Sequence, residues 1–261
     1  MDQSNSSCVI SQISSRFNES LSLSNFEYSM DHKRRGKCVI FRHDHFDEVE
    51  DCHREMNKHP ENENDVHSLR ACFGLLGFEV IVHNDLKEKE IRSTLKAVSE
   101  EDHSDEDCLI LCFITIKQEH FLSAKDGKFE IESLSEYFNA KKCPSLAGKP
   151  KMCFIQAFPV LYDASIEFDN EVDTPFFEFK GLNFKTSMCP DFFFSYSRVS
   201  YMQTLAKNMY EFGSKLSILD VFLKINHDVA LELGPSDEDE EGAFVTIFFT
   251  LSRRLILKPK N

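Results

Sequence analysis

Thiols and imidazoles are the side chains of this chain that are best suited to nucleophilic chemistry. Its 261 residues include nine cysteines and ten histidines, and many proteases attack peptide bonds with a cysteine thiolate that a neighbouring histidine activates. The cysteine count is odd and several cysteines lie in apolar, strand-like runs, which indicates reduced thiols rather than a disulfide framework. Cys153 lies inside such a run, and neither Cys143 nor Cys189 has a histidine paired with it in the sequence.

Zinc binding is a second kind of chemistry open to these side chains. His43, His45, Cys52 and His53 carry the nitrogen and sulfur atoms that ligate zinc. Their spacing fits no named zinc module, so a polar loop is the simpler interpretation. We predict no metal site and no cofactor of any other kind.

Composition and charge argue against several classes of partner. The net charge of −14 disfavours nucleic acids and anionic membranes, because both need a basic surface. No apolar run approaches the length of a membrane span, and the N-terminus lacks the apolar region of a secretory signal. With 41% apolar residues the chain can bury a full core as one structural domain. The reduced thiols indicate a cytoplasmic protein.

Short apolar runs predict the strands that must position any reactive group. The run at 149–160, KPKMCFIQAFPV, contains prolines near both ends and predicts a buried strand. Similar runs alternate with amphipathic helices through the first half, which indicates a wound α/β sheet. Asp65 is the predicted N-cap of the first helix and Gly77 its C-terminal stop. Strands are predicted at 37–42, 78–83, 108–115, 192–197 and 244–250, and helices at 65–77, 87–98, 202–212 and 216–233.

An ordered series of motifs resembles the caspases, the Asp-directed cysteine proteases. YSMDHKRRG at 28–36 resembles the Y-x-M-x-x-x-x-R-G segment that introduces the first caspase strand, and LSAKDG at 122–127 resembles the hairpin after the catalytic-histidine loop. Gln156 and Ala157 match the start of the nucleophile motif QAC-[RQG]-G, and FFFSYS at 192–197 matches the first small-subunit strand. The resemblance covers residues 26 to about 258, and it points to short-prodomain effector caspases of invertebrates.

This resemblance implies a fold and an organisation of the chain. The expected fold is the caspase-like (caspase–hemoglobinase) α/β fold, a mostly parallel six-stranded sheet flanked by helices on both faces. We expect a disordered tail at 1–24, a large-subunit-like region at 25–162, an inter-subunit linker at 163–188 and a small-subunit-like region at 189–261. Asn170-Glu171-Val172-Asp173 in the linker resembles a caspase cleavage site, which makes Asp173 a candidate processing site. A solvated acidic loop is the other interpretation.

The positions that correspond to the caspase nucleophile and base hold apolar side chains. Counting along the resemblance puts Phe158 at the nucleophile position and Ile116 at the histidine position. Neither side chain can attack a carbonyl or accept a proton, so we predict a pseudo-protease that is not an enzyme. The alternative is an active or rearranged Asp-directed cysteine endopeptidase acting in apoptosis. His120, close after Ile116, is either a displaced base or a surface histidine.

The substrate pocket is degenerate by the same resemblance. Caspases hold the substrate aspartate with arginines, whose planar guanidinium pairs with a carboxylate in bidentate fashion. His59 stands where the first arginine is expected, and the loop that carries the second is missing before Tyr201. Gln156 is retained, and Arg198 is either a substitute or a surface residue.

The apolar pattern of the last predicted strand indicates how the chain acts. In caspases this strand pairs with its copy across a two-fold axis, and here it is apolar on both faces, as a strand central to a larger sheet would be. The residues of this predicted dimer interface are Phe244, Val245, Thr246, Ile247, Phe248 and Phe249. We therefore predict a regulator of apoptosis that pairs with an active caspase paralogue, or acts as its decoy, or forms a homodimer. A covered strand within a monomer is the other interpretation.

Overall fold

The computed structural model describes residues 26–47, 61–118, 121–131, 133–159, 190–197, 200–233 and 244–260. The strands are β1 (Lys37–Arg42), β2 (Glu79–Asn84), β3 (Leu109–Gln118), β4 (Phe121–Ser123), β5 (Lys128–Glu130), β6 (Lys151–Pro159), β7 (Phe192–Ser197) and β8 (Thr246–Phe249). The helices are α2 (Glu61–Leu75), α3 (Glu88–Glu100), α4 (Ser133–Tyr137), α5 (Met202–Phe212) and α6 (Ile218–Leu233), with a short 3-10 turn η3 (Pro144–Leu146).

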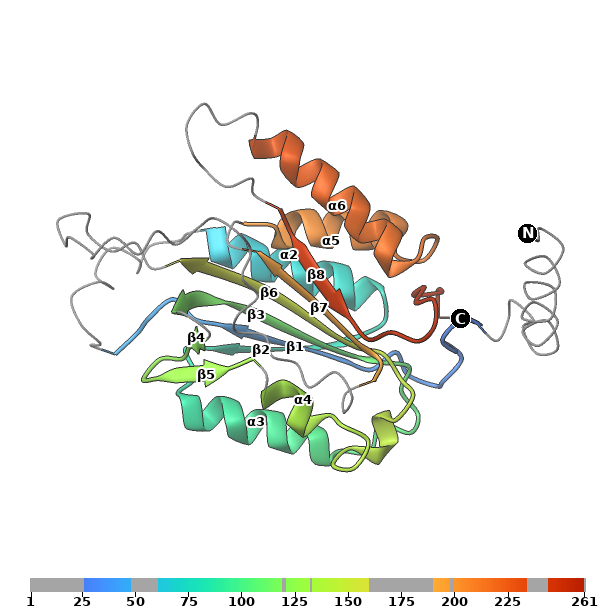
Figure 1. The fold of residues 1–261 in the computed structure, drawn as a ribbon, viewed down its shortest axis with the longest axis horizontal. Coiled ribbons are helices and arrows are strands. Elements are labelled where there is room, and N and C mark those ends of the chain that lie inside the picture. Colours follow the sequence, from blue (N-terminus) through green and yellow to red (C-terminus); the bar gives the residue numbers. More distant parts are fainter. Residues whose placement is uncertain are drawn as a thin grey trace, which may run out of the picture.

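One sheet runs through the molecule in the order β2-β1-β3-β6-β7-β8. Neighbouring strands from β2 to β7 are parallel, whereas β7 and β8 pair antiparallel. The β4–β5 hairpin attaches to the carboxyl end of β3. Helices α2, α5 and α6 lie on one face of the sheet, and α3 and α4 lie on the other (Figure 1). The predicted mostly parallel sheet with helices on both faces is therefore confirmed.

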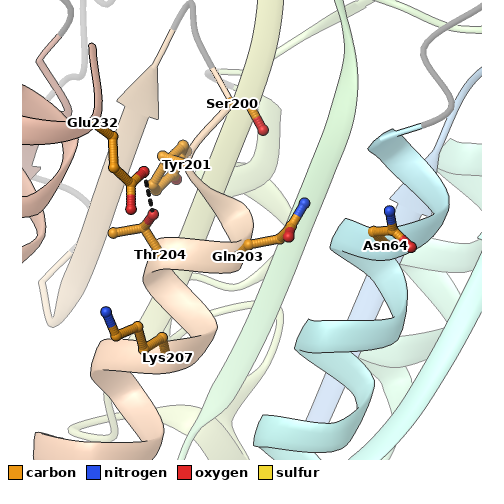
Figure 2. Close-up of a pocket in the computed structure, with 7 residues that line it drawn as sticks. All are labelled: Asn64, Ser200, Tyr201, Gln203, Thr204, Lys207 and Glu232. Carbon is orange, nitrogen blue, oxygen red and sulfur yellow. Dashed lines mark hydrogen bonds between the residues drawn. The ribbon is translucent and has the colours of Figure 1, made fainter. Parts of the chain in front are cut away.

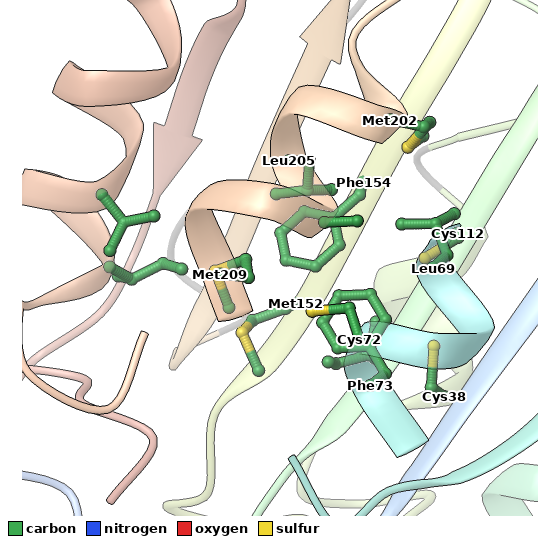
Figure 3. Packing of buried hydrophobic residues seen from close by; sticks show 14 of the residues in the cluster. Cys38, Leu69, Cys72, Phe73, Cys112, Met152, Phe154, Met202, Leu205 and Met209 are labelled. Carbon is green, nitrogen blue, oxygen red and sulfur yellow. The ribbon is translucent and has the colours of Figure 1, made fainter. Parts of the chain in front are cut away.

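Side-chain alternation along the strands divides the core into two layers. On β6, Met152 and Phe154 pack in the layer under α2 and α5, together with Phe73 and Leu205 (Figure 3). Cys153 and the other intervening residues of this strand pack in the opposite layer, towards α3 and α4. Both faces of the strand are buried, which explains why its sequence is apolar without alternation.

The Arg-Gly pair before β1 is explained by packing at the amino edge of the sheet. The buried guanidinium of Arg35 lies 3.0 Å from an Asp107 carboxylate oxygen, and the Lys260 ammonium lies 2.6 Å from the same oxygen. Gly36 has a φ of +117°, and a Cβ at this position would lie 1.9 Å from the carbonyl oxygen of Cys108. A larger residue at position 36 would need the backbone to move.

The predicted elements lie where the sequence places them, and three of them have the predicted bounds at both ends. Strands β1 and β7 and helix α5 agree with the prediction at both ends. Gly77, with a φ of +90°, ends α2 as expected, since its N–H bonds the Gly74 carbonyl. Within the described residues, no helix is both long enough and apolar enough to cross a membrane.

Two of the boundaries that differ from the prediction have a clear structural cause or consequence. Helix α2 begins at Glu61, so Asp65 lies inside the helix instead of capping it, and its side chain is buried. Strand β8 begins at Thr246, because Val245 is buried and both of its backbone hydrogen-bonding groups bond the side-chain amide of Asn226.

Candidate functional site

The carboxyl ends of β3 and β6 bring two predicted site positions together. Ile116 and Phe158 are register partners on these parallel strands. Alternation places both on the face of the sheet that α2 and α5 cover, which is also the face of Gln156. Ile116 is 3% exposed and Phe158 is half-buried. Two apolar side chains therefore hold adjacent positions at the edge where the resemblance places nucleophile and base.

Gln156 belongs to a buried polar network beside this pair. Its Nε2 donates to Asp65 over 2.7 Å, and its Oε1 accepts the backbone N–H groups of Tyr201 and Met202 at 2.8 and 3.1 Å. The other carboxylate oxygen of Asp65 accepts a hydrogen bond from Gln203 Nε2 at 2.9 Å. The amide oxygen of Gln156 is thus engaged by the start of α5.

A pocket of about 500 Å³ opens beside this network, between the start of α2, the start of α5 and the end of α6 (Figure 2). Its lining residues are Asn64, Ser200, Tyr201, Gln203, Thr204, Lys207 and Glu232. The Thr204 hydroxyl donates to Glu232 over 3.2 Å. Lys207 is the cation among these described lining residues, which include no arginine. The described lining therefore offers no guanidinium group of the kind that holds a carboxylate in bidentate fashion.

The described cysteines lie in the core. Those with buried, free thiols are Cys38, Cys72, Cys108, Cys112, Cys143 and Cys153. Figure 3 shows Cys38, Cys72 and Cys112 in the layer between the sheet and α2. Burial raises the pKa of the Cys72 thiol to about 12 and also raises the pKa values of Cys38 and Cys153. These three thiols stay protonated at neutral pH, which makes them poor nucleophiles.

An aspartate orients an exposed histidine at the same edge of the sheet. His45 Nδ1 lies 2.8 Å from Asp85 Oδ2, and the side chain of this histidine is 70% exposed. Asp85 Oδ1 accepts the backbone N–H groups of Asp44 and His45 at 2.8 and 3.0 Å. Burial opposes ionisation of Asp85, but these hydrogen bonds hold the pKa of its carboxyl below the ordinary value.

Sequence reasoning missed this aspartate–histidine pair. The two residues are 40 positions apart and follow different strands. The signal that would find them is the predicted adjacency of β1 and β2, since the carboxyl ends of parallel neighbours meet at one edge. The nearby His43 is buried, and its Nε2 lies 3.0 Å from the Leu86 carbonyl oxygen. Among the residues that the structure describes, no group of three histidines, cysteines, aspartates or glutamates is placed to hold a metal.

The predicted interface strand lies at the edge of the sheet. On its inner side β8 pairs with β7. Val245 is 1% exposed in the chain's own core, and Ile247 packs partly against the same cluster. Phe244 and Phe249 are 53% and 42% exposed. These placements leave pairing across a two-fold axis as a prediction.

Other predicted positions fall outside the described part of the chain. They are Cys52, His53, His59, His120, Asp173, Cys189 and Arg198, together with the tail at 1–24 and the linker at 163–188. The roles expected of them, and the predicted division of the chain into regions, stay predictions.

Comparisons with known proteins identify similar chains and structures. The family model described as caspase domain matches residues 35–246. Caspase-1 of Drosophila melanogaster is 33% identical over 227 residues, which cover 79% of this chain and 66% of that protein. Caspase-1 of Spodoptera frugiperda is 41% identical over 130 residues, 50% of this chain and 42% of that protein. The chain therefore matches less than two thirds of the length of either relative.

Solved structures of caspase-1 have a similar fold. A crystal structure of caspase-1 from Spodoptera frugiperda superposes with a TM-score of 0.72 at 30% identity, and the match covers 90% of this chain and 96% of that one. A structure described as pro-sf-caspase-1 superposes with a TM-score of 0.73 at 29% identity, over 90% of this chain and 100% of that one.

The prediction that the chain is not an enzyme is contradicted by these comparisons. The similar proteins are named caspases, which are cysteine peptidases, and similarity to them points to an enzyme. The prediction rested on the side chains at Ile116 and Phe158 and on the degenerate substrate pocket. Apolar residues at two strand ends do not exclude a thiol and an imidazole that other segments bring to the site.

Proposed function

The chain belongs to the caspase family, and from this premise we propose that it acts in the proteolysis of apoptosis, in the cytoplasm. The caspase domain, matched over residues 35–246, is the observation that carries the proposal. The matching sheet of caspase-1 structures and the relatives among apoptotic caspases support it.

The first candidate activity is that of an Asp-directed cysteine endopeptidase with rearranged chemistry. Such an enzyme needs a thiolate, and the described thiols are buried in the core. The nucleophile must therefore come from Cys8, Cys52 or Cys189. His45 is suited to act as its base, because Asp85 fixes one ring nitrogen and the ring is open to solvent.

Hydrolysis of fluorogenic Asp peptides tests this activity. We expect turnover that iodoacetamide abolishes, and loss of that turnover in one of the variants Cys8→Ser, Cys52→Ser and Cys189→Ser. His45→Gln should lower kcat about 100-fold, the effect of removing a general base. The control is His227→Gln, since His227 is also exposed and near a carboxylate, 3.4 Å from Asp228, but on α6. Turnover no higher than in buffer, or insensitive to alkylation, would contradict the activity.

The second candidate function is regulation of an active caspase by pairing with it. The observation that favours it is the half-exposed edge strand β8, with the Phe249 ring 42% exposed. An unpaired apolar edge is a template for another strand. A second copy of this chain or a caspase paralogue would extend the sheet across that edge, and either pairing would be compatible with catalysis by this chain.

A further inference from the structure

Arg42, the last residue of β1, lies at the same edge and on the same face of the sheet as the candidate site. Its register partner on β3 is Ile114, whose partner on β6 is Gln156. Register partners on parallel strands share a face, and two steps between strands place the backbones of Arg42 and Gln156 about 10 Å apart. Arg42 therefore brings a guanidinium to the edge where Ile116 and Phe158 lie near the ends of the neighbouring strands.

The guanidinium of Arg42 has a charged neighbour but no hydrogen-bond partner among the described residues. Its Nε lies 2.5 Å from Asp44 Oδ2, in an ion pair that lacks hydrogen-bond geometry. The Nε atom is buried, and no described acceptor bonds it. No hydrogen bond joins its two terminal nitrogens to another residue that the structure describes. An unpaired buried donor is costly, so a ligand that supplied acceptor oxygens here would be stabilised.

The turn after β1 holds this arginine close to the candidate base. Asp85 Oδ1 accepts the backbone N–H groups of Asp44 and His45, and Asp85 Oδ2 lies 2.8 Å from His45 Nδ1. One carboxylate thus fixes both the turn and the imidazole. In an aspartate residue the side-chain carboxylate is close to the carbonyl of the same residue. A substrate aspartate held by Arg42 would therefore bring its own peptide bond to the turn that carries His45.

A carboxylate is the ligand group that suits this arrangement. Its two oxygens pair with a planar guanidinium through two parallel hydrogen bonds, whereas a neutral amide offers one oxygen acceptor. Asp44 lowers the local positive charge, but its contact is with Nε, which leaves the terminal nitrogens of Arg42 for a ligand. The Arg42 side chain is 21% exposed although its Nε is buried, so a ligand can approach it from solvent.

We propose that Arg42 binds the carboxylate of the substrate aspartate and thereby determines the preference for acidic peptides. The inference rests on the proposed function, because an Asp-directed endopeptidase needs a group that recognises this carboxylate. It gives that role to a residue of β1, in place of Arg198, which the sequence leaves as either a substitute or a surface residue. Binding alone is sufficient to test it, whether or not a bond is cut.

Chemical protection of the unaltered chain tests this assignment. Phenylglyoxal reacts with accessible guanidinium groups, and mass spectrometry of the digested chain measures the modification of each arginine. The probes are acetyl-Asn-Glu-Val-Asp-amide and acetyl-Asn-Glu-Val-Asn-amide. We expect the Asp peptide to slow the modification of Arg42 at least five-fold, at a concentration where the Asn peptide has no effect. Arg92 is the internal reference, because it pairs with Glu88 on the opposite side of the sheet, and its rate should not change (Figure 1).

Two variants assign the binding energy to one arginine. Arg42→Gln should weaken the Asp peptide about ten-fold in calorimetric titrations and leave the Asn peptide unchanged, whereas Arg198→Gln should change neither. Protection of Arg198 in place of Arg42, equal protection by both peptides, or protection of neither arginine would overturn the inference. The protection experiment needs no variant, so it decides the question even if Arg42→Gln misfolds. A chain that binds the Asp peptide at Arg42 without cutting any Asp peptide would contradict the endopeptidase proposal alone.

Discussion

Ile116 and Phe158 are register partners at the carboxyl ends of β3 and β6. Neither side chain has a lone pair or a titratable proton, so reactive groups at this edge must arrive from other segments. Gln156 shares their face of the sheet, and its amide is committed to Asp65 and to the start of α5. At this edge of the sheet, Ile116 and Phe158 are therefore apolar, and Gln156 is polar and held in place by its hydrogen bonds.

A double substitution tests whether these two positions face each other. In the variant Phe158→Cys with Ile116→His, the imidazole should draw the proton from the introduced thiol, because parallel register partners lie side by side. We expect iodoacetamide to alkylate that thiol at least ten-fold faster than in Phe158→Cys alone, measured by peptide mass spectrometry. The six described thiols are buried and serve as the internal reference. Equal rates in both variants would show that the two side chains diverge.

The sequence places some site residues and not others, for a physical reason. Gln156 and Phe158 follow from local motif counting along one apolar run. Asp65 has the local pattern of a helix cap, a short polar side chain before an apolar periodic stretch. Its partners Gln156 and Gln203 are 91 and 138 positions away, and no local pattern encodes those contacts. Hydrogen bonds to residues distant in the sequence therefore determine the role of Asp65.

At the scale of elements, apolar runs bounded by turn residues predict the strands well. Strand β8 begins later than predicted. The amide of Asn226 on α6 bonds both backbone groups of Val245, so these groups do not take part in the pairing with β7. Besides the hydrogen bond from Thr204 to Glu232, a second side-chain hydrogen bond joins α5 and α6, in which Asn208 Nδ2 donates to Asp228 over 3.0 Å. Helix periodicity predicts the two helices but not the side chains that join them.

The hydrogen bond between Asn208 of α5 and Asp228 of α6 predicts that the stability of the fold depends on pH. The hydrogen bond from Asn208, followed by the one from Lys224, holds the pKa of Asp228 at about 2, below its ordinary value of 3.8. Its folded pKa is lower than its unfolded one, so its stabilisation is present above about pH 4 and is lost as pH falls towards 2.

We expect Asp228→Asn to lower the free energy of unfolding by about 1 kcal/mol at pH 7. The effect is small because solvent screens the charge of this carboxylate. The difference should shrink between pH 5 and pH 3 in urea titrations. Glu100→Gln is the control, since it removes a carboxylate from an exposed pair with Lys96. A difference that is constant over this pH range would assign the loss to packing instead of charge.

At the scale of the whole molecule, the sheet ends in an apolar edge at β8. The fold class and the order of its elements follow from the sequence, because strand and helix periods and the caspase motifs agree with one another. Whether that edge is covered depends on a second chain, which a single sequence does not describe. Phe249 is the exposed strand residue on which this question can be tested, since Ile247 packs partly inside the chain's own core.

Phe249→Glu should abolish pairing at this edge. A carboxylate in the middle of a joined sheet would be desolvated without a partner, which costs several kcal/mol, on the order of 3–5. We expect sedimentation to show loss of the dimer and co-expression with an effector caspase to show loss of its capture. Leu223→Glu is the control, because Leu223 is 69% exposed on α6 and lies outside the strand. Capture that survives in a variant with native circular dichroism would place the contact on another surface.

The β8 edge has room for one further strand, so the proposed homodimer and heterodimer would be mutually exclusive states of the same chain. Their balance follows mass action: the homodimer grows with the square of this chain's concentration, and the heterodimer grows with the product of two concentrations. If the chain pairs in this way, its expression level would decide which pair predominates. At low abundance, beside an excess of paralogue, most copies would be in mixed pairs; at high abundance self-pairing would limit the concentration of chain free to pair with the paralogue.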